Sequence, residues 1–274
     1  MANSTRGAAF RLRTDGAVKL EEFLRSDYLK ECRESFDWSV AHPGPSAAQV
    51  FRGTAHQHLN DNANPAATQM YKNLVARGPF ADFLAEAWGS QSVWFFAEEI
   101  FSKEGGRAGR TPWHQDTSYA PWRGEHWANF WISFQPIPKA NSIEIVKGSH
   151  RGVRYDGSAY DDPEDPTKPL WGGGLPRLPD IEAERRVDPS RWDVLSWEVR
   201  PGDVIVFHGG ALHGGAPVNA ACPDRHTLVL RFFGDDATFE ALPNGKSGFL
   251  FPKEPLAHLK SGDPFRSPYF AQLR

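Results

Sequence analysis

Short runs of apolar, β-branched and aromatic residues alternate along this chain with polar turns, a pattern that predicts mainly β-structure. Each run has the length of a strand and is bounded by Gly, Pro, Asn, Asp or Ser. The runs lie at residues 17–20, 93–101, 127–134, 143–146, 201–208 (a turn and then a strand) and 225–233. Short strands separated by turn signals predict a sandwich or barrel. The chain shows no internal repeat or linker, so we predict one domain over residues 1–274.

The N-terminal third has helical spacing instead. Apolar residues recur at helical intervals over 20–36, and again over 68–88, where Thr68 is the predicted N-cap and Gly78-Pro79 should divide the helix in two. We predict a loose arm for residues 1–16, and loop with at most one short strand for 42–67. Residues 152–180 are rich in Pro, Gly and Asp. A loop this long is usually functional, so we predict a lid-like insertion that carries substrate specificity.

Composition restricts the class of partner. The net charge of −3 gives no basic surface for nucleic acid, and no stretch of 18 apolar residues could cross a membrane. The two cysteines are far apart in the chain, and the N-terminus lacks the apolar region of a signal peptide. We therefore expect a cytoplasmic protein that acts on a small molecule, and the sequence leaves the oligomeric state open.

Candidate chemistry centres on Thr111-Pro112-Trp113-His114-Gln115-Asp116. If this stretch is a strand, His114 and Asp116 share one face, where an imidazole and a carboxylate can bind one divalent ion. The best third ligand is His213, in the glycine-rich run 209–215. Two histidines and one carboxylate form the facial triad of non-haem Fe(II) oxygenases. Arg225, which follows, suggests a dicarboxylate cosubstrate because a guanidinium binds a carboxylate with two hydrogen bonds.

In this order, these residues resemble the phytanoyl-CoA dioxygenase family of Fe(II)/2-oxoglutarate-dependent oxygenases. The resemblance covers roughly residues 95–240 and rests on the segments 111–116, 130–133, 143–151, 201–215 and 225–236. It implies a double-stranded β-helix, the jelly roll also found in cupins, flanked by the N-terminal helices. It also implies that His114, Asp116 and His213 bind Fe(II), that Arg225 binds 2-oxoglutarate, and that O₂ is the oxidant.

The same resemblance implies further site residues. Trp131 matches an aromatic residue of the cosubstrate pocket, and Thr111 and Glu99 match positions that often make a further cosubstrate contact. The implied reaction oxidises a small organic metabolite and releases succinate and CO₂. Because Asp116 occupies the position that related halogenases leave open for chloride, hydroxylation is favoured over halogenation.

Aromatic residues are abundant, with 10 Trp, 19 Phe and 6 Tyr. Many of the tryptophans are close in sequence to the proposed metal site. They either fill a wide β-core or line a pocket for an apolar or cyclic substrate, and the second interpretation makes Trp113 and Trp122 candidate substrate contacts.

The remaining ionisable residues that could bind a metal or an anion are assigned to other roles. His208 should be dispensable for metal binding, because on one continuous strand it would face away from His213. His226 should likewise face away from the cosubstrate. We predict a turn role for His150 and exposure to solvent for His56, His58 and Lys103. The Gly-Lys-Ser at 245–247 lacks the spacing of a phosphate-binding loop.

Two other classes of protein remain open. A cupin-like isomerase or hydrolase could use the same fold with another metal, and it would give Arg225 no special role. A non-catalytic binding relative is the second alternative, and the intact set of three ligands and one arginine argues against it.

Overall fold

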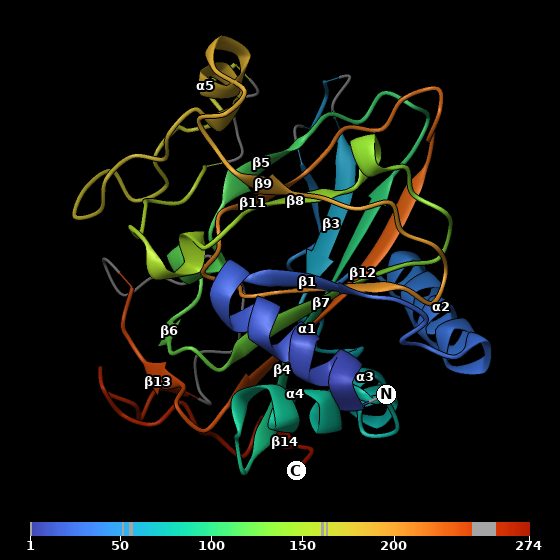
Figure 1. The fold of residues 1–274 in the computed structure, drawn as a ribbon, viewed down its shortest axis with the longest axis vertical. Helices are drawn as coiled ribbons and strands as arrows, with labels where there is room; N and C mark the ends of the chain where they lie inside the picture. Colours follow the sequence, from blue (N-terminus) through green and yellow to red (C-terminus); the bar gives the residue numbers. More distant parts are fainter. Residues whose placement is uncertain (1, 51, 55–56, 160–161, 163, 243–255) are drawn as a thin grey trace.

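Antiparallel strands dominate the computed structural model (Figure 1), which describes the chain except residues 1, 51, 55–56, 160–161, 163 and 243–255. The strands are β1 (Ala17–Leu20), β2 (Ala48–Val50), β3 (His58–Asn62), β4 (Val93–Lys103), β5 (Thr111–His114), β6 (Trp122–Arg123), β7 (Trp127–Ser133), β8 (Ile143–Val146), β9 (Val194–Leu195), β10 (Val204–Phe207), β11 (His213–Gly215), β12 (Arg225–Gly234), β13 (Thr238–Phe239) and β14 (Ala271–Gln272). The α-helices are α1 (Ala2–Asp15), α2 (Ser26–Ala41), α3 (Thr68–Val75), α4 (Phe80–Trp88) and α5 (Ile181–Val187). The prediction of a mainly β protein with flanking helices is confirmed.

Two antiparallel sheets carry the candidate site. The larger has the order β1-β10-β7-β12-β4-β3-β2, with β14 added beside β4, and the smaller has the order β5-β11-β8-β9. Strand β12 is central, because it pairs with β4 along its whole length and with β7 on its other edge. Chain segments far apart in sequence therefore present side chains to one space between the sheets.

Alternation along the strands divides the larger sheet into two apolar faces. Ile100 and Leu228 point outward into a core that includes residues of α1 to α4. Phe101, Val229 and Trp131 point the other way and pack with residues of the smaller sheet. The helices thus cover the outer face (Figure 1), and the inner face is left for the cavity.

The predicted break in the 68–88 helix is confirmed, since α3 ends at Val75 and α4 begins at Phe80. A side chain at Gly78 would lie 2.5 Å from the Tyr28 hydroxyl, so it would have to displace that side chain. The predicted cap is wrong. Thr68 is the first residue of α3, and its hydroxyl donates to the Asn64 carbonyl at 3.2 Å.

Three other N-terminal predictions are corrected. Residues 2–15 form helix α1 rather than a loose arm, and it packs on α4 and β1 through Ala8, Ala9 and Leu12. These residues are mostly small and give a weak apolar pattern. The second helix begins at Ser26 rather than at residue 20, whereas the predicted strand at residues 17–20 is present and pairs with β10. The 42–67 segment contains two strands, β2 and β3, rather than at most one.

Within the described part of the chain, no helix is long and apolar enough to cross a membrane. The Gly-Lys-Ser at 245–247 lies outside the described residues. The assignment of residues 1–274 to one domain stays a prediction.

Candidate metal centre and cosubstrate cavity

Three ligand-type side chains meet where β5 and β11 lie side by side. His114 is the last residue of β5, His213 is the first residue of β11, and the two are register partners. Each histidine Nε2 lies 3.7 Å from Asp116 Oδ1, and the two imidazole centroids are 4.2 Å apart. Across the residues that the structure describes, this is the one group of three or more His, Cys, Asp or Glu arranged to hold a metal ion.

The local backbone fixes the tautomer of both histidines. His114 Nδ1 lies 2.8 Å from the Pro112 carbonyl, and His213 Nδ1 lies 2.9 Å from the Ala211 carbonyl. A carbonyl only accepts, so each Nδ1 carries the proton and each Nε2 presents its lone pair toward Asp116. Burial, together with the nearby His114, lowers the pKa of His213 to about 3. His213 is therefore in the neutral form that a metal requires.

The expectation that 114–116 is one strand is wrong, although His114 and Asp116 do converge on one side as predicted. Strand β5 ends at His114, and Asp116 opens the 3₁₀ turn η1 (Asp116–Ser118). The amide N–H of Asp116 donates to the Gly209 carbonyl at 2.7 Å, which turns the carboxylate back toward the histidines. Gln115 points the other way, as predicted, and its side-chain amide donates to the Gly210 carbonyl at 2.8 Å.

A β-bulge explains why Thr111 and His114 both face the cavity although they are three residues apart. The register shifts between the two strands, so Pro112 and Trp113 of β5 lie opposite the single residue Gly214 of β11. A bulge re-aims the side chains that follow it. A Cβ on Gly214 would lie 2.9 Å from the Thr111 carbonyl, so the close approach requires glycine.

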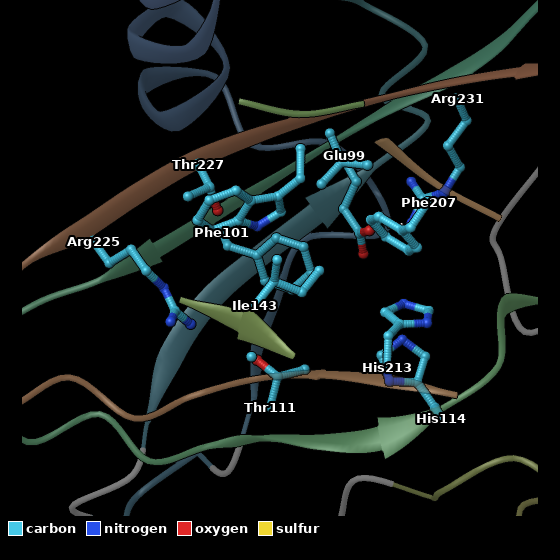
Figure 2. Close-up of a pocket in the computed structure, with 13 residues that line it drawn as sticks. Glu99, Phe101, Thr111, His114, Ile143, Phe207, His213, Arg225, Thr227 and Arg231 are labelled. Carbon is cyan, nitrogen blue, oxygen red and sulfur yellow. Dashed lines mark hydrogen bonds and ion pairs between the residues drawn. The ribbon is translucent and has the colours of Figure 1, made fainter. Parts of the chain in front are cut away.

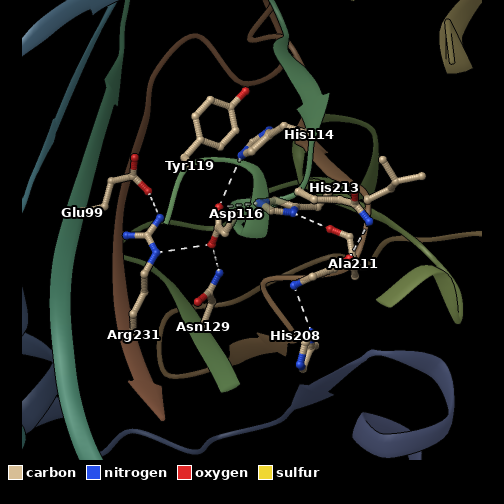
Figure 3. A network of polar contacts seen from close by, with 12 residues as sticks. Glu99, His114, Asp116, Tyr119, Asn129, His208, Ala211, His213 and Arg231 are labelled. Carbon is tan, nitrogen blue, oxygen red and sulfur yellow. Dashed lines mark hydrogen bonds and ion pairs between the residues drawn. The ribbon is translucent and has the colours of Figure 1, made fainter. Parts of the chain in front are cut away.

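The second carboxylate oxygen of Asp116 is held from the larger sheet (Figure 3). Asp116 Oδ2 accepts from Asn129 Nδ2 at 2.6 Å and from Arg231 Nε at 3.4 Å, and Arg231 also forms an ion pair with Glu99. Burial alone would raise the pKa of Asp116, but Arg231, His213 and His114 outweigh it and lower that pKa. The carboxylate is thus ionised, with Oδ1 left to face the histidines.

A cavity of about 40 Å³ runs from the histidines to Arg225 (Figure 2). Trp131, Thr111 and Glu99 line it. The Glu99 carboxylate lies at the metal end, where it pairs with Arg231 and accepts from Asn60 Nδ2 at 2.8 Å. Its contact with a cosubstrate remains a prediction.

Arg225 lies at the far end of the cavity and is 3% exposed. Its Nη1 donates to the Asn141 carbonyl, and its Nε has no hydrogen-bond partner among the described residues. Burial lowers the pKa of Arg225 to about 10, which still leaves the guanidinium charged near neutral pH. A buried guanidinium with an unused donor is suited to bind an anion.

The two candidate substrate tryptophans lie outside this cavity. Trp113 packs in a separate apolar cluster, and its Nε1 donates to Glu182 at 2.9 Å. Trp122 stacks on Trp127 with ring centroids 3.6 Å apart and lines a second cavity beside Arg123 and Arg154. Their contact with substrate remains a prediction.

Three of the other histidines lie outside the metal centre. His208 uses both ring nitrogens, since Nδ1 accepts from the Gly210 amide at 2.9 Å and Nε2 lies 3.1 Å from the Gly124 carbonyl. His150 is in a 3₁₀ turn with Nε2 3.0 Å from the Arg13 carbonyl, and His226 pairs with Glu104 away from the cavity.

Two predictions of solvent exposure are wrong. His58 is 3% exposed within strand β3, and Lys103 is 0% exposed at the end of β4. His56 lies outside the described residues. The burial of these two side chains could not be predicted from the sequence, because both residues lie beside polar turn segments.

The predicted lid segment is anchored beside the metal centre. Gln115 Nε2 donates to the Val153 carbonyl at 3.1 Å, and Gln115 Oε1 accepts from the Tyr155 amide at 2.9 Å. Further along, Trp171 Nε1 donates to the Ser118 carbonyl at 2.9 Å. Part of the 152–180 loop therefore attaches to the turn that carries Asp116, and closure over a substrate stays a prediction.

The family model for phytanoyl-CoA dioxygenase (PhyH) matches residues 12–227, and the chain belongs to this family. No curated protein sequence matches it. Among solved structures, it is similar to the non-heme alpha ketoglutarate dependent epimerase SnoN from nogalamycin biosynthesis, in complex with Fe3+, alpha ketoglutarate and nogalamycin RO, at 17% identity, TM-score 0.71 and 100% coverage of both chains. It is also similar to the carbocyclase SnoK from the same biosynthesis, at 19% identity and TM-score 0.69 over 98% of this chain and 96% of that one.

A third similar structure is EctD from S. alaskensis with 2-oxoglutarate and 5-hydroxyectoine, at 17% identity and TM-score 0.63 over 93% of this chain and 83% of that one. These likenesses confirm the predicted double-stranded β-helix. The family model confirms the resemblance on which the cofactor prediction was based. The sequence analysis did not identify Asn129 or Arg231 as site residues. The only signal was the alternation along the strand, which places Arg225 and Arg231 on the same face.

Proposed function

We propose that this protein is an Fe(II)- and 2-oxoglutarate-dependent oxygenase that oxidises a small organic metabolite. The observation that carries the proposal is one cavity with His114, Asp116 and His213 at one end and the buried Arg225 at the other. Membership of the PhyH family supports it, as do the ligands of the similar structures, SnoN with Fe3+ and alpha ketoglutarate and EctD with 2-oxoglutarate.

The residues present fit both groups. Two neutral imidazoles and one ionised carboxylate form the donor set that non-haem Fe(II) prefers, and each Nε2 is directed at the same point as Asp116 Oδ1. Arg225 has an unpartnered Nε and, among the described residues, no carboxylate of its own. When bound, Fe(II), 2-oxoglutarate and O₂ would supply the oxidising chemistry and release succinate and CO₂.

The protein's own contribution is orientation. His114, Asp116 and His213 would hold the metal. Arg225 would fix the far end of the cosubstrate, with Thr111 and Trp131 beside its chain. Buried apolar walls such as Phe207 and Ile143 exclude water from the space between.

We infer that hydroxylation is the reaction, because Asp116 completes the ligand set. Related chemistry stays open to test, since the similar structures include an epimerase and a carbocyclase as well as EctD. We propose that the 152–180 loop closes over the substrate and carries specificity. Replacing its exposed Gly172 to Gly174 stretch should change substrate preference and leave cosubstrate binding unchanged.

The direct experiment is anaerobic. Fe(II) and then 2-oxoglutarate are added to the wild type and to Arg225→Ala, and the visible charge-transfer band of the chelate is recorded. The proposal predicts a band in the wild type that needs more 2-oxoglutarate in the variant. Bound Fe(II) with no band at any concentration of 2-oxoglutarate would refute the oxygenase and favour a cupin-like isomerase or hydrolase.

A further inference from the structure

Lys103 is a buried cation beside the proposed cosubstrate arginine. It is the last residue of β4, it is 0% exposed, and it lies directly opposite Arg225 in the β4–β12 register. Residues directly opposite in an antiparallel pair share a face of the sheet, with Cβ atoms about 5 Å apart. Two basic side chains therefore stand together on the inner face of the larger sheet.

Neither cation has an acidic partner in the described part of the chain. Lys103 Nζ donates to the Gly109 carbonyl at 2.5 Å, and Arg225 Nη1 donates to the Asn141 carbonyl. A third cation nearby, Arg110, is already paired with Glu144 and Glu182. A buried charge without a counter-charge is costly, so a ligand that brings negative charge would be bound strongly here.

The other ionisable groups near this pair do not supply that charge. Glu99, on the same face of β4, pairs with Arg231. Asp224, next to Arg225, accepts from the Gly105 amide at 2.9 Å, and Glu104 turns outward to His226. His58 on β3 carries no negative charge, and burial raises the pKa of the Cys222 thiol, which keeps that thiol neutral.

The unliganded state therefore disfavours a second positive charge. Burial, followed by the charges of Arg225 and Arg110, lowers the pKa of Lys103 well below its usual range. A neutral amine still donates a hydrogen bond to Gly109. A carboxylate at Arg225 would cancel the repulsion and favour the protonated amine.

We propose that Lys103 is a second cosubstrate-positioning cation, and that binding of the distal carboxylate of 2-oxoglutarate is accompanied by uptake of one solvent proton at Lys103 Nζ. This rests on the proposed function. Lys103 is not among the residues that line the cavity, so it acts through Arg225 and through the 104–110 segment that it ties to β4. The neutral amine gains a proton, no other bond changes, and the distal carboxylate then lies beside both cations.

The test is titration calorimetry of the Fe(II)-loaded protein with 2-oxoglutarate, under anaerobic conditions at one pH in buffers of different ionisation enthalpy. The dependence of the heat on the buffer gives the number of protons taken up. The wild type should take up about one proton per 2-oxoglutarate, and its affinity should fall by up to about tenfold per pH unit above the pKa of the unliganded amine.

Lys103→Met should still bind 2-oxoglutarate through Arg225, with weaker affinity and no proton uptake. The matched control is Lys30→Met, whose side chain is 78% exposed on α2, and it should behave as the wild type. Circular dichroism checks folding, and should Lys103→Met fail to fold, the wild-type titration alone decides.

Binding without proton uptake in the wild type, or equal uptake in Lys103→Met, would overturn the role of Lys103 and leave the oxygenase intact. Absence of any 2-oxoglutarate binding, with metal bound, would instead overturn the proposed function and this inference with it.

Discussion

The two ends of the cavity differ in whether their buried charges are paired within the protein. At the metal end, Asp116, Arg231 and Glu99 form a buried chain of alternating charge, completed by Asn129. At the other end, Arg225 and Lys103 lie together without a carboxylate among the described residues. At the metal end each buried charge has a partner within the protein, whereas at the far end the cations are left for a ligand to pair with.

The difference indicates which parts of the site are preformed. A metal site needs ligands held in one geometry before the ion arrives, and hydrogen bonds to Asp116 and to both histidines supply this. A site for an exchanging dicarboxylate gains affinity from charges that only the ligand neutralises. Removing a buried cation should therefore have opposite effects at the two ends.

Loss of a metal ligand should have the largest effect. His213→Ala removes one of three donors. Binding of Fe(II) or Co(II) should therefore be undetectable over the range of metal concentrations in which the wild type binds. His208→Ala is the matched control, because its ring already uses both nitrogens in hydrogen bonds to the backbone. Metal binding lost equally in a folded His208→Ala protein would contradict the assignment of ligands.

Arg231→Met should destabilise the fold. It leaves Asp116 and Glu99 buried without their shared partner, which costs about 3–5 kcal/mol in the free energy of unfolding. The double variant with Glu99→Gln should recover part of that loss, because one of the unpaired charges is removed. Chemical denaturation of the metal-free proteins measures both, and a single variant as stable as the wild type would break the comparison.

Asn129→Leu should have an intermediate effect, on metal affinity. It removes the 2.6 Å hydrogen bond to Asp116 Oδ2, and loss of such a partner of a ligand typically weakens metal binding about 10- to 100-fold. Asn129→Asp replaces the donating amide by a carboxylate, which can only accept, and should weaken metal binding as well. Unchanged Co(II) affinity in both variants would show that the geometry of Asp116 does not depend on this contact.

Lys103→Met should have the smallest effect on stability. Replacing a buried amine that has no acidic partner by an apolar side chain of similar length should leave the free energy of unfolding unchanged or raise it. Chemical denaturation of metal-free Lys103→Met and Arg231→Met, measured under the same conditions, compares their free energies of unfolding directly. A loss as large as that of Arg231→Met would mean that Lys103 has an acidic partner and that the far end is already balanced.

Much of this architecture was readable from the sequence, and the failures have identifiable physical causes. The strands of the core and the break at Gly78-Pro79 follow from periodicity and from turn chemistry. The three candidate metal ligands were predicted from residue type and order. Helix α1 was missed because its buried face is made of small residues, and the length of β5 because tertiary contacts end that strand at His114.

The bulge and the charge pairing could not be read from the sequence. Whether Thr111 and His114 face the same side depends on one glycine, Gly214, opposite two residues of the neighbouring strand. Arg231 and Lys103 look alike in the sequence, as basic residues in or beside strands, and only the fold shows that one is paired and the other is not.

The central claim is that the distal carboxylate of the cosubstrate completes the charge balance at Arg225. The most direct measurement compares the anaerobic affinity of the Fe(II)-loaded protein for 2-oxoglutarate and for 2-oxobutyrate, which lacks that carboxylate, in the wild type and in Arg225→Ala. We predict that the wild type prefers 2-oxoglutarate by about 10- to 100-fold, as expected for a buried charged hydrogen bond, and that the variant loses the preference. Equal affinities in the wild type, or an undiminished preference in the variant, would contradict the account.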